Sequence, residues 1–169
     1  MMKAEEKFLA GYDKYASAIL RHIFFRVSDQ TLAEDLAQET FFKAWRHIAK
    51  TGEEIKNFKT FFYKIADNLI IDHYRRKSRK EFPLEDVGEN ELAVSAPQEK
   101  EAEGTANKNL IEKYLKEIGD DYRQALICRY IDDLSIKEIS EITGKSANNI
   151  SVMIHRALKM LREKYDKRI

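Results

Sequence analysis

The sequence predicts an all-α protein of two small helical bundles joined by a flexible acidic linker, with a helix-turn-helix in the C-terminal bundle. Three observations predict this fold class. Apolar residues recur at spacings of three and four along several long segments, which is the period of an amphipathic helix. Alternation with the period of a β-strand is sparse. A polar stretch that contains both prolines of the chain separates the two helical parts.

Charge divides the 169-residue chain in the same way, although the net charge of +1 by itself indicates no partner. Residues 1–81 contain 16 Lys and Arg against 12 Asp and Glu, and residues 107–169 contain 13 against 10. Residues 82–106 contain one basic residue against seven acidic residues, with Pro83 and Pro97. Because this segment has few large apolar residues, we expect a flexible linker between an N-terminal domain, 1–81, and a C-terminal domain, 107–169. Fully extended, the linker would reach about 80 Å, enough for both domains to lie on one DNA duplex.

The composition also indicates a compartment. Cys128 is the only cysteine, so an internal disulfide is excluded, and its apolar neighbours predict a small buried side chain. The N-terminus lacks the apolar core of a signal peptide, and no apolar run is long enough to span a membrane. We therefore expect a cytoplasmic protein.

A helix with a wide apolar face is predicted over residues 32–48. Thr31 and Glu34 have the spacing of a capping box that would open it. Four large apolar side chains cover too wide an arc for all of them to point into a bundle of about 80 residues: Phe41, Phe42, Trp45 and Ile48. Some are expected to contact a partner protein, with a polar rim of Asp35, Gln38 and Glu39. For any one of these residues alone, the core or a solvated face is the simpler interpretation.

The next helix, predicted from Asn57 to about Lys80, is apolar on nearly all sides. Its first buried face is Phe58, Phe61, Phe62, Ile65 and Leu69, whereas Tyr63, Asp67, Ile70, Ile71 and Tyr74 lie on other sides. Such a helix is either central in its bundle or meets something other than water on its second face. Asn68, Asp72 and the cations that follow them favour nucleic acid, because aromatics and amides beside a basic groove suit unstacked bases.

The C-terminal part contains two short amphipathic helices hinged at Gly144, the pattern of a helix-turn-helix. Ser135 and Glu138 form a capping box before the first helix, and Ser146 is placed to cap the second. Apolar residues such as Ile150 and Ile154 face the core. The other faces carry Asn148, Asn149, Ser151, Val152, His155 and Arg156, and short polar side chains in such a place read base edges in the major groove. An ordinary helical hairpin with solvated polar residues is the alternative.

The sequence gives little support for an enzyme. Its histidines, at positions 22, 47, 73 and 155, show no close metal-ligand spacing, and there is no glycine-rich phosphate loop. The carboxylates of residues 34–39 lack the Glu-x-x-His companion of a di-iron helical bundle. We therefore predict no catalytic residue, no bound metal and no cofactor.

Taken in order, these segments resemble bacterial RNA polymerase sigma factors of the extracytoplasmic-function group. The resemblance spans nearly the whole chain. Ala33–Arg46 is similar to the family's polymerase-clamp-binding helix, and Phe61–Arg76 is similar to its promoter-melting helix. Tyr122–Tyr130 and Leu134–Glu163 are similar to the family's second conserved domain, including the stretch His155–Ala157. All of these motifs in the family's order, with a polar linker between them, make chance agreement improbable.

The resemblance implies a site for each partner. Asp35, Gln38, Glu39, Phe42 and Trp45 would engage the clamp of the largest subunit of core RNA polymerase. Asn68, Asp72, Arg75, Arg76 and Lys77, with the loop near Gly52, would capture the minus-ten element of promoter DNA. Lys145, Ser146, Asn148, Asn149, Ser151, Val152, His155 and Arg156 would contact the minus-thirty-five element. The family also commonly has an anti-sigma factor as an inhibitor, and no small-molecule substrate is expected.

One departure from the family pattern affects the second DNA site. Family members commonly carry a basic residue where this chain has Ser151 and an Arg where it has Met153. Two expected DNA-contacting cations are therefore absent, and the minus-thirty-five sequence should differ accordingly. The alternative function is an autonomous helix-turn-helix regulator whose N-terminal bundle serves oligomerisation or sensing, but it leaves the aromatic helices without a task.

Overall fold

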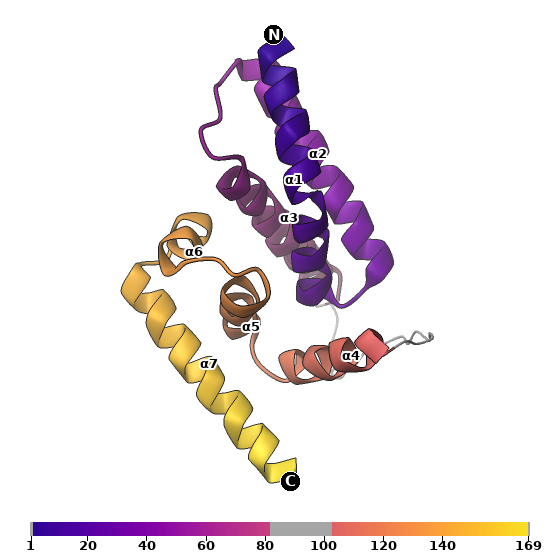
Figure 1. The fold of residues 1–169 in the computed structure, drawn as a ribbon. Helices are drawn as coiled ribbons and strands as arrows, with labels where there is room; N and C mark the ends of the chain where they lie inside the picture. The colour runs from indigo at the N-terminus through magenta and orange to yellow at the C-terminus, as the bar shows by residue number, and fades with distance from the viewer. Residues whose placement is uncertain (1, 82–102, 169) are drawn as a thin grey trace.

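The computed structural model describes residues 2–81 and 103–168, and the regular structure in both ranges is helical (Figure 1). The N-terminal domain consists of α1 (Met2–Val27), α2 (Gln30–Thr51) and α3 (Phe58–Glu81). The C-terminal domain consists of α4 (Glu103–Lys116), α5 (Asp120–Leu126), the π-helical turn η1 (Ile127–Ile131), α6 (Ile136–Thr143) and α7 (Ala147–Arg168). The all-α fold class is confirmed.

The predicted linker, residues 82–106, lies mostly outside the described residues. The description resumes with α4 at Glu103, so residues 103–106, which we assigned to the linker, are helical. The start of α1 and the end of α7 lie at opposite ends of the molecule (Figure 1). Among the described helices, none is long and apolar enough to cross a membrane.

The boundaries of α2 and α3 follow from polar side chains and one glycine. Asp29, rather than the expected Thr31 and Glu34 pair, caps α2: its carboxylate accepts a hydrogen bond of 3.1 Å from the Leu32 amide. The helix ends at Gly52, whose φ of +71° is a left-handed conformation that glycine adopts at little steric cost. Asn57 accepts a hydrogen bond of 3.1 Å from the Thr60 amide and opens α3 where the sequence predicted it.

The helix-turn-helix forms as the sequence predicted. The Glu138 amide donates to Ser135 Oγ at 3.0 Å, and the Ser135 amide donates to Glu138 Oε1 at 2.9 Å, which completes the capping box. The hydrogen bond from the Ser135 backbone, together with the ammonium of Lys59, holds the pKa of Glu138 below its usual range. Gly144 follows α6 with a φ of +80°, and Ser146 Oγ then caps α7 by accepting from the Asn149 amide at 3.0 Å.

The core of the N-terminal domain is built around Phe62, which is fully buried. Its ring centroid lies 4.9 Å from that of Phe41, 5.5 Å from that of Phe58 and 6.0 Å from that of Phe8. These rings come from all three helices of the domain and meet mostly edge to face, the arrangement that aromatic quadrupoles favour. The Phe62 side chain therefore packs against aromatic residues from α1, α2 and α3.

The second face of α3 packs against the C-terminal domain. Tyr63 and Ile70 on this face are buried, as are Leu134 and Ile139 of the C-terminal domain in the same cluster. Burying two apolar faces against each other removes both from water, and this is the main force that joins the domains. The second face does meet something other than water, as predicted. The partner in this structure is the chain's own C-terminal domain, so our nucleic-acid interpretation is wrong for Tyr63, Asp67 and Ile70.

We expect the substitution Phe62→Ala to lower the free energy of unfolding by about 3–5 kcal/mol, because it removes a fully buried ring and leaves a cavity among three helices. Urea denaturation followed by circular dichroism measures this change. Phe42→Ala is the matched control, since the Phe42 side chain is 60% exposed and its removal should cost less than about 1 kcal/mol. Equal losses for the two variants would contradict the packing described above.

Candidate nucleic-acid and protein interfaces

One face of α2 remains uncovered and combines carboxylates with an aromatic ring. We call Asp35, Gln38, Glu39 and Phe42, all exposed, the α2 face; their spacing of three and four places them on one side of the helix. Phe42 is 60% exposed, and the Arg46 guanidinium lies 5.3 Å from its ring centroid. The expectation that some aromatics of this helix point outward is confirmed for Phe42, whereas Phe41 and Ile48 are in the core.

Trp45 differs from the four residues of the α2 face. It is half-buried, and its ring centroid lies 5.3 Å from that of Phe8 in the core. The structure therefore gives this side chain a packing role, and only part of its surface is available to a partner.

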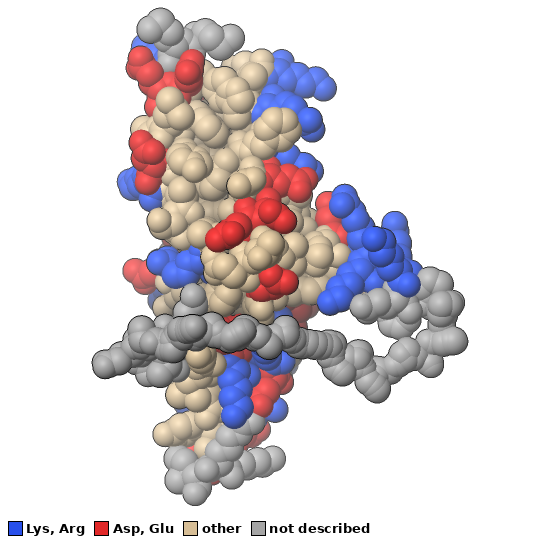
Figure 2. Space-filling view, turned by 90° about the vertical axis from the view of Figure 1, so that its right-hand side faces the viewer, with Lys and Arg blue, Asp and Glu red and all other residues tan. Residues whose placement is uncertain are grey.

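A groove of about 460 Å³ runs beside the α2 face, between α1 and α2. Apolar and acidic side chains line it, among them Tyr12, Leu20, Glu34 and Phe41. Figure 2 shows this side of the molecule: acidic side chains are set in uncharged surface, and a separate group of basic side chains stands at one edge. Such a surface suits a partner that offers apolar side chains together with cations.

The predicted minus-ten residues lie along the part of α3 that the C-terminal domain does not cover. Asn68, Arg75, Arg76 and Lys77 are exposed, and Asp72 is half-buried with its carboxylate 3.8 Å from Arg75 Nη1. Burial and the charges of Lys77 and Arg76 lower the pKa of the neighbouring His73, which favours its neutral form. The end of α3 therefore presents a cationic surface that suits phosphate groups.

The predicted minus-thirty-five residues lie at the start of α7. Six of them share an exposed surface: Asn148, Asn149, Ser151, Val152, His155 and Arg156. Ser146 is exposed as well, but its hydroxyl caps the helix, and the ammonium of the half-buried Lys145 lies 4.0 Å from an Asp121 carboxylate oxygen. Met153, where the family commonly has an Arg, is 9% exposed and packs into the core. Position 153 therefore faces the core of the protein, and our expectation that its substitution removes a DNA-contacting cation is wrong.

A buried polar network joins the two domains between these surfaces. Arg26 of α1 donates to Asp67 Oδ1 of α3 at 2.9 Å and lies 3.3 Å from the carboxylate of Asp120 on α5. The Gln124 side chain on α5 donates to the same Asp67 oxygen at 2.5 Å. Burial lowers the pKa of Arg26, but attraction to Asp120 and Asp67 outweighs this effect and leaves the pKa above its ordinary value.

Two further polar contacts cross between the domains. His22 Nδ1 of α1 lies 2.7 Å from Asp132 Oδ2, just after η1, and Lys59 Nζ of α3 lies 3.1 Å from Glu138 Oε2 of α6. Cys128 of η1 is buried as expected, and burial raises the pKa of its thiol. Sequence reasoning missed this interface, because its partners are far apart in the chain. The available signal was a polar residue, such as Asp67, on an otherwise apolar helix face.

The two domains correspond to known protein families. Residues 12–80 match the family model of Sigma-70 region 2, and residues 108–161 match that of Sigma-70, region 4. The chain is 33% identical over 156 residues to the ECF RNA polymerase sigma factor SigM of Bacillus subtilis, covering 92% of this chain and 93% of that protein. It is 30% identical over 158 residues to the RNA polymerase sigma factor YlaC of the same organism, and the match covers 92% of this chain and 90% of that protein.

Two solved structures share the fold. The sigma factor RpoE of Bartonella quintana, crystallised with the anti-sigma factor NepR, matches with a TM-score of 0.75 and 23% identity over 94% of this chain and 96% of that chain. CnrH, in complex with the cytosolic domain of CnrY, matches with a TM-score of 0.71 and 18% identity, over 96% of this chain and 90% of that chain.

The two Sigma-70 regions, on a helical fold that includes a helix-turn-helix, define a DNA-binding transcription initiation factor. The chain belongs to the extracytoplasmic-function group of RNA polymerase sigma factors. It acts as a sigma factor, which binds core RNA polymerase and directs promoter-specific transcription. The family matches do not favour the autonomous regulator that we considered as the alternative.

We expect Asp67→Ala to lower the free energy of unfolding by about 3 kcal/mol, because it leaves the buried guanidinium of Arg26 with only the more distant Asp120. Chemical denaturation of the full chain measures this loss. Asp72→Ala on the same helix is the matched control, and its screened contact with Arg75 should contribute less than about 1 kcal/mol. A loss for Asp67→Ala no larger than for Asp72→Ala would show that the network does not stabilise the chain.

Proposed function

We propose that the α2 face binds the clamp of the largest subunit of core RNA polymerase. Phe42 carries this proposal, because its ring is 60% exposed and lies on the same helix face as Asp35 and Glu39, a combination that suits a partner with both apolar and cationic side chains. Asp35 and Glu39 beside it would pair with cations of the clamp, and Gln38 would add a polar contact. Trp45 would contribute mainly by fixing α2 against the domain core.

The two domains would read the two promoter elements. The exposed part of α3, with Asn68, Asp72, Arg75, Arg76 and Lys77, would capture the minus-ten element as the duplex opens. The start of α7, with Asn148, Asn149, Ser151, Val152, His155 and Arg156, would read the minus-thirty-five element in the major groove. Lys145 and Ser146 would stand at the rim of this second site.

Binding to polymerase would compensate for the weak DNA affinity of each domain. Each domain carries few cations, so neither should hold promoter DNA well by itself. Docking both on one polymerase raises the effective concentration of each for its own element. The connection that follows residue 81 and ends before α4 would then have one reading domain on each side. We propose that the protein is cytoplasmic and has no enzymatic activity of its own.

An anti-sigma factor is a further proposed partner. Of the two similar structures described above, one contains the sigma factor RpoE with the anti-sigma factor NepR, and the other contains CnrH with the cytosolic domain of CnrY. In this chain such a protein would cover the α2 face, whose Gln38 lines the groove of about 460 Å³, or would insert between the domains. Either position would compete with polymerase.

Reconstitution with core polymerase tests the function. The purified chain with core enzyme should start RNA synthesis at discrete sites on bacterial genomic DNA, and transcript mapping should reveal a shared pair of upstream elements. Core enzyme alone is the control. Absence of any such start site would contradict the assignment of promoter recognition to this chain.

We expect Phe42→Ala to weaken binding to core polymerase by about tenfold or more, because a buried aromatic at an interface is commonly a hot spot. Fluorescence anisotropy with labelled chain and core enzyme measures the affinity. Tyr165→Ala, which removes a ring with 52% exposure at the far end of α7, should leave the affinity nearly unchanged. Equal effects of the two substitutions would argue against the α2 face.

We expect the double substitution Asn148→Ala/Asn149→Ala to reduce transcription from a mapped promoter by about fivefold or more, since a good base contact contributes about 1–3 kcal/mol. Run-off transcription with a saturating concentration of the protein measures this effect. The affinity of the variant for core polymerase should not change. Glu163→Gln, an exposed site farther along α7, is the control. If promoter choice and transcript yield both remained normal, these amides would have no role in recognition.

A further inference from the structure

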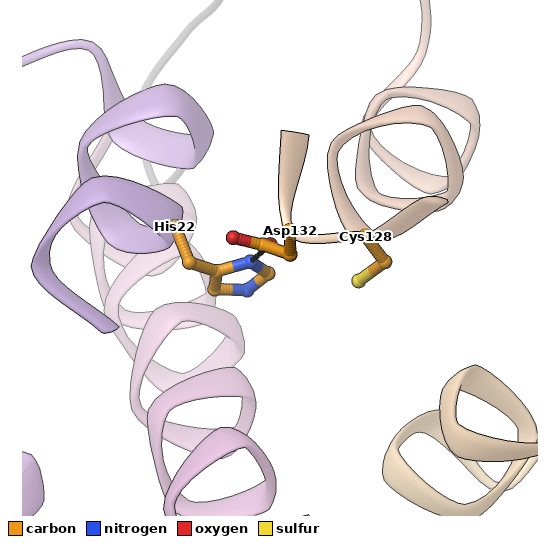
Figure 3. Close-up of side chains that lie close together, drawn as sticks. All are labelled: His22, Cys128 and Asp132. Carbon is orange, nitrogen blue, oxygen red and sulfur yellow. Dashed lines mark hydrogen bonds and ion pairs between the residues drawn. The ribbon is translucent and has the colours of Figure 1, made fainter. Parts of the chain in front are cut away.

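The buried space between α1 and η1 contains a cluster of metal-binding side chains from both domains. His22, Cys128 and Asp132 each offer one ligand atom, and these three atoms lie within 4.8 Å of one another. Figure 3 shows the His22 ring beside Asp132, with the Cys128 sulfur pointing toward the ring. All three residues are buried, with 0%, 0% and 8% exposure. We propose that this cluster binds a thiophilic divalent metal ion, with Zn²⁺ as the representative ion, across the domain interface.

The donor set suits this class of metal. Imidazole nitrogen, thiolate sulfur and carboxylate oxygen are the usual protein ligands of Zn²⁺, at about 2.0–2.3 Å from the ion. Ligand atoms around a tetrahedral ion at these lengths stand about 3.3–3.6 Å apart, so the present separations, within 4.8 Å, need to shrink by up to about 1.5 Å. His22 Nδ1 and Asp132 Oδ2, at 2.7 Å, need to move slightly apart. Rotamer adjustment supplies movements of this size without a change of fold.

Unsatisfied polar atoms point to a missing partner at the same place. His22 Nε2 and Asp132 Oδ1 are both buried without a hydrogen-bond partner. A buried polar atom left unpaired is unfavourable, and native structures contain few of them. Asp132 Oδ1 has an ion pair of 3.6 Å with Arg21 Nη2, and the Arg21 side chain is 47% exposed. A metal ion held between His22 Nδ1 and the Asp132 carboxylate would satisfy Asp132 Oδ1, the carboxylate oxygen that lacks a hydrogen bond.

Charge balance favours a divalent ion in this buried position. On binding, the Cys128 thiol releases its proton to solvent and becomes a thiolate, while Asp132 is a carboxylate and His22 is a neutral imidazole. Two negative ligands neutralise the two positive charges of Zn²⁺, so the site as a whole carries no net charge into the protein interior. The fourth position of the tetrahedron would be filled by water.

The site would also connect the two domains. His22 comes from α1 of the N-terminal domain, and the other two ligands come from η1 and the residue after it. A metal ion that needs all three ligands binds only while α1 and η1 are in contact. Binding would therefore stabilise the packed arrangement of the domains by mass action. From the sequence we predicted no bound metal and did not find these three ligands, because His22 and Cys128 lie in different domains.

Cobalt and zinc binding to the full chain tests the proposal. Co²⁺ added to metal-free protein should produce a thiolate-to-cobalt charge-transfer absorption in the near ultraviolet, and Zn²⁺ should remove it with a stoichiometry of about one ion per chain. Zn²⁺ should also raise the melting temperature of the chain. Neither readout depends on transcription, so a negative result here would leave the sigma-factor function untouched.

Two variants make the test specific. Cys128→Ala should abolish the absorption and lower Zn²⁺ affinity by at least about tenfold, and its small apolar side chain suits the buried position. His22→Asn should have the same effect on affinity while keeping an N–H donor for Asp132. His47→Ala, at an exposed histidine that pairs with Glu53, is the control, and it should bind Zn²⁺ with the affinity of the unaltered chain. Absence of the absorption in folded protein, or unchanged Zn²⁺ affinity in Cys128→Ala, would overturn the proposal.

Discussion

Arg26 imposes the constraint on which the arrangement of the two domains depends. A guanidinium with 1% exposure is stable in a protein interior only where carboxylates and hydrogen-bond acceptors surround it. Asp67 provides one carboxylate from the N-terminal domain, and Asp120 provides the other from the C-terminal domain. Apolar packing supplies most of the attraction between the domains, but apolar surfaces slide over one another readily. The ion pairs select one register from the many that hydrophobic contact would allow.

This constraint gives α3 three separate surfaces. One surface, around Phe62, forms the core of the N-terminal domain, and a second, with Tyr63 and Ile70, packs against the C-terminal domain. The third carries Asn68 and the basic residues toward Lys77 and stays in solvent. A helix with so many apolar residues is therefore compatible with nucleic-acid contact, because most of its apolar side chains are packed within the protein and its polar side chains remain in solvent.

The sequence was informative where the physical cause is local. The capping box of Ser135 and Glu138 and the left-handed Gly144 depend on residues close in the chain, and both were predicted correctly. The start of α2 was predicted two residues late because Asp29 and Thr31 are both good capping residues, and the sequence does not say which wins. The interface of His22 with Asp132 was not predicted, since it joins residues 110 positions apart. Exposure of Phe42 was predicted only as one of several outcomes for a group of aromatics, because a helical wheel does not show where neighbouring helices will lie.

The N-terminal domain leaves the ribosome first, so the apolar face of α3 is made before the domain that covers it. Ile70 is made before Ile139, and translation of the intervening chain takes roughly 3–14 s at the usual rate of about 5–20 residues per second. During that interval the apolar side of α3 has no cover from its own chain, although the α1–α3 bundle is already complete. The nascent protein therefore exposes this apolar surface until α6 has been synthesised.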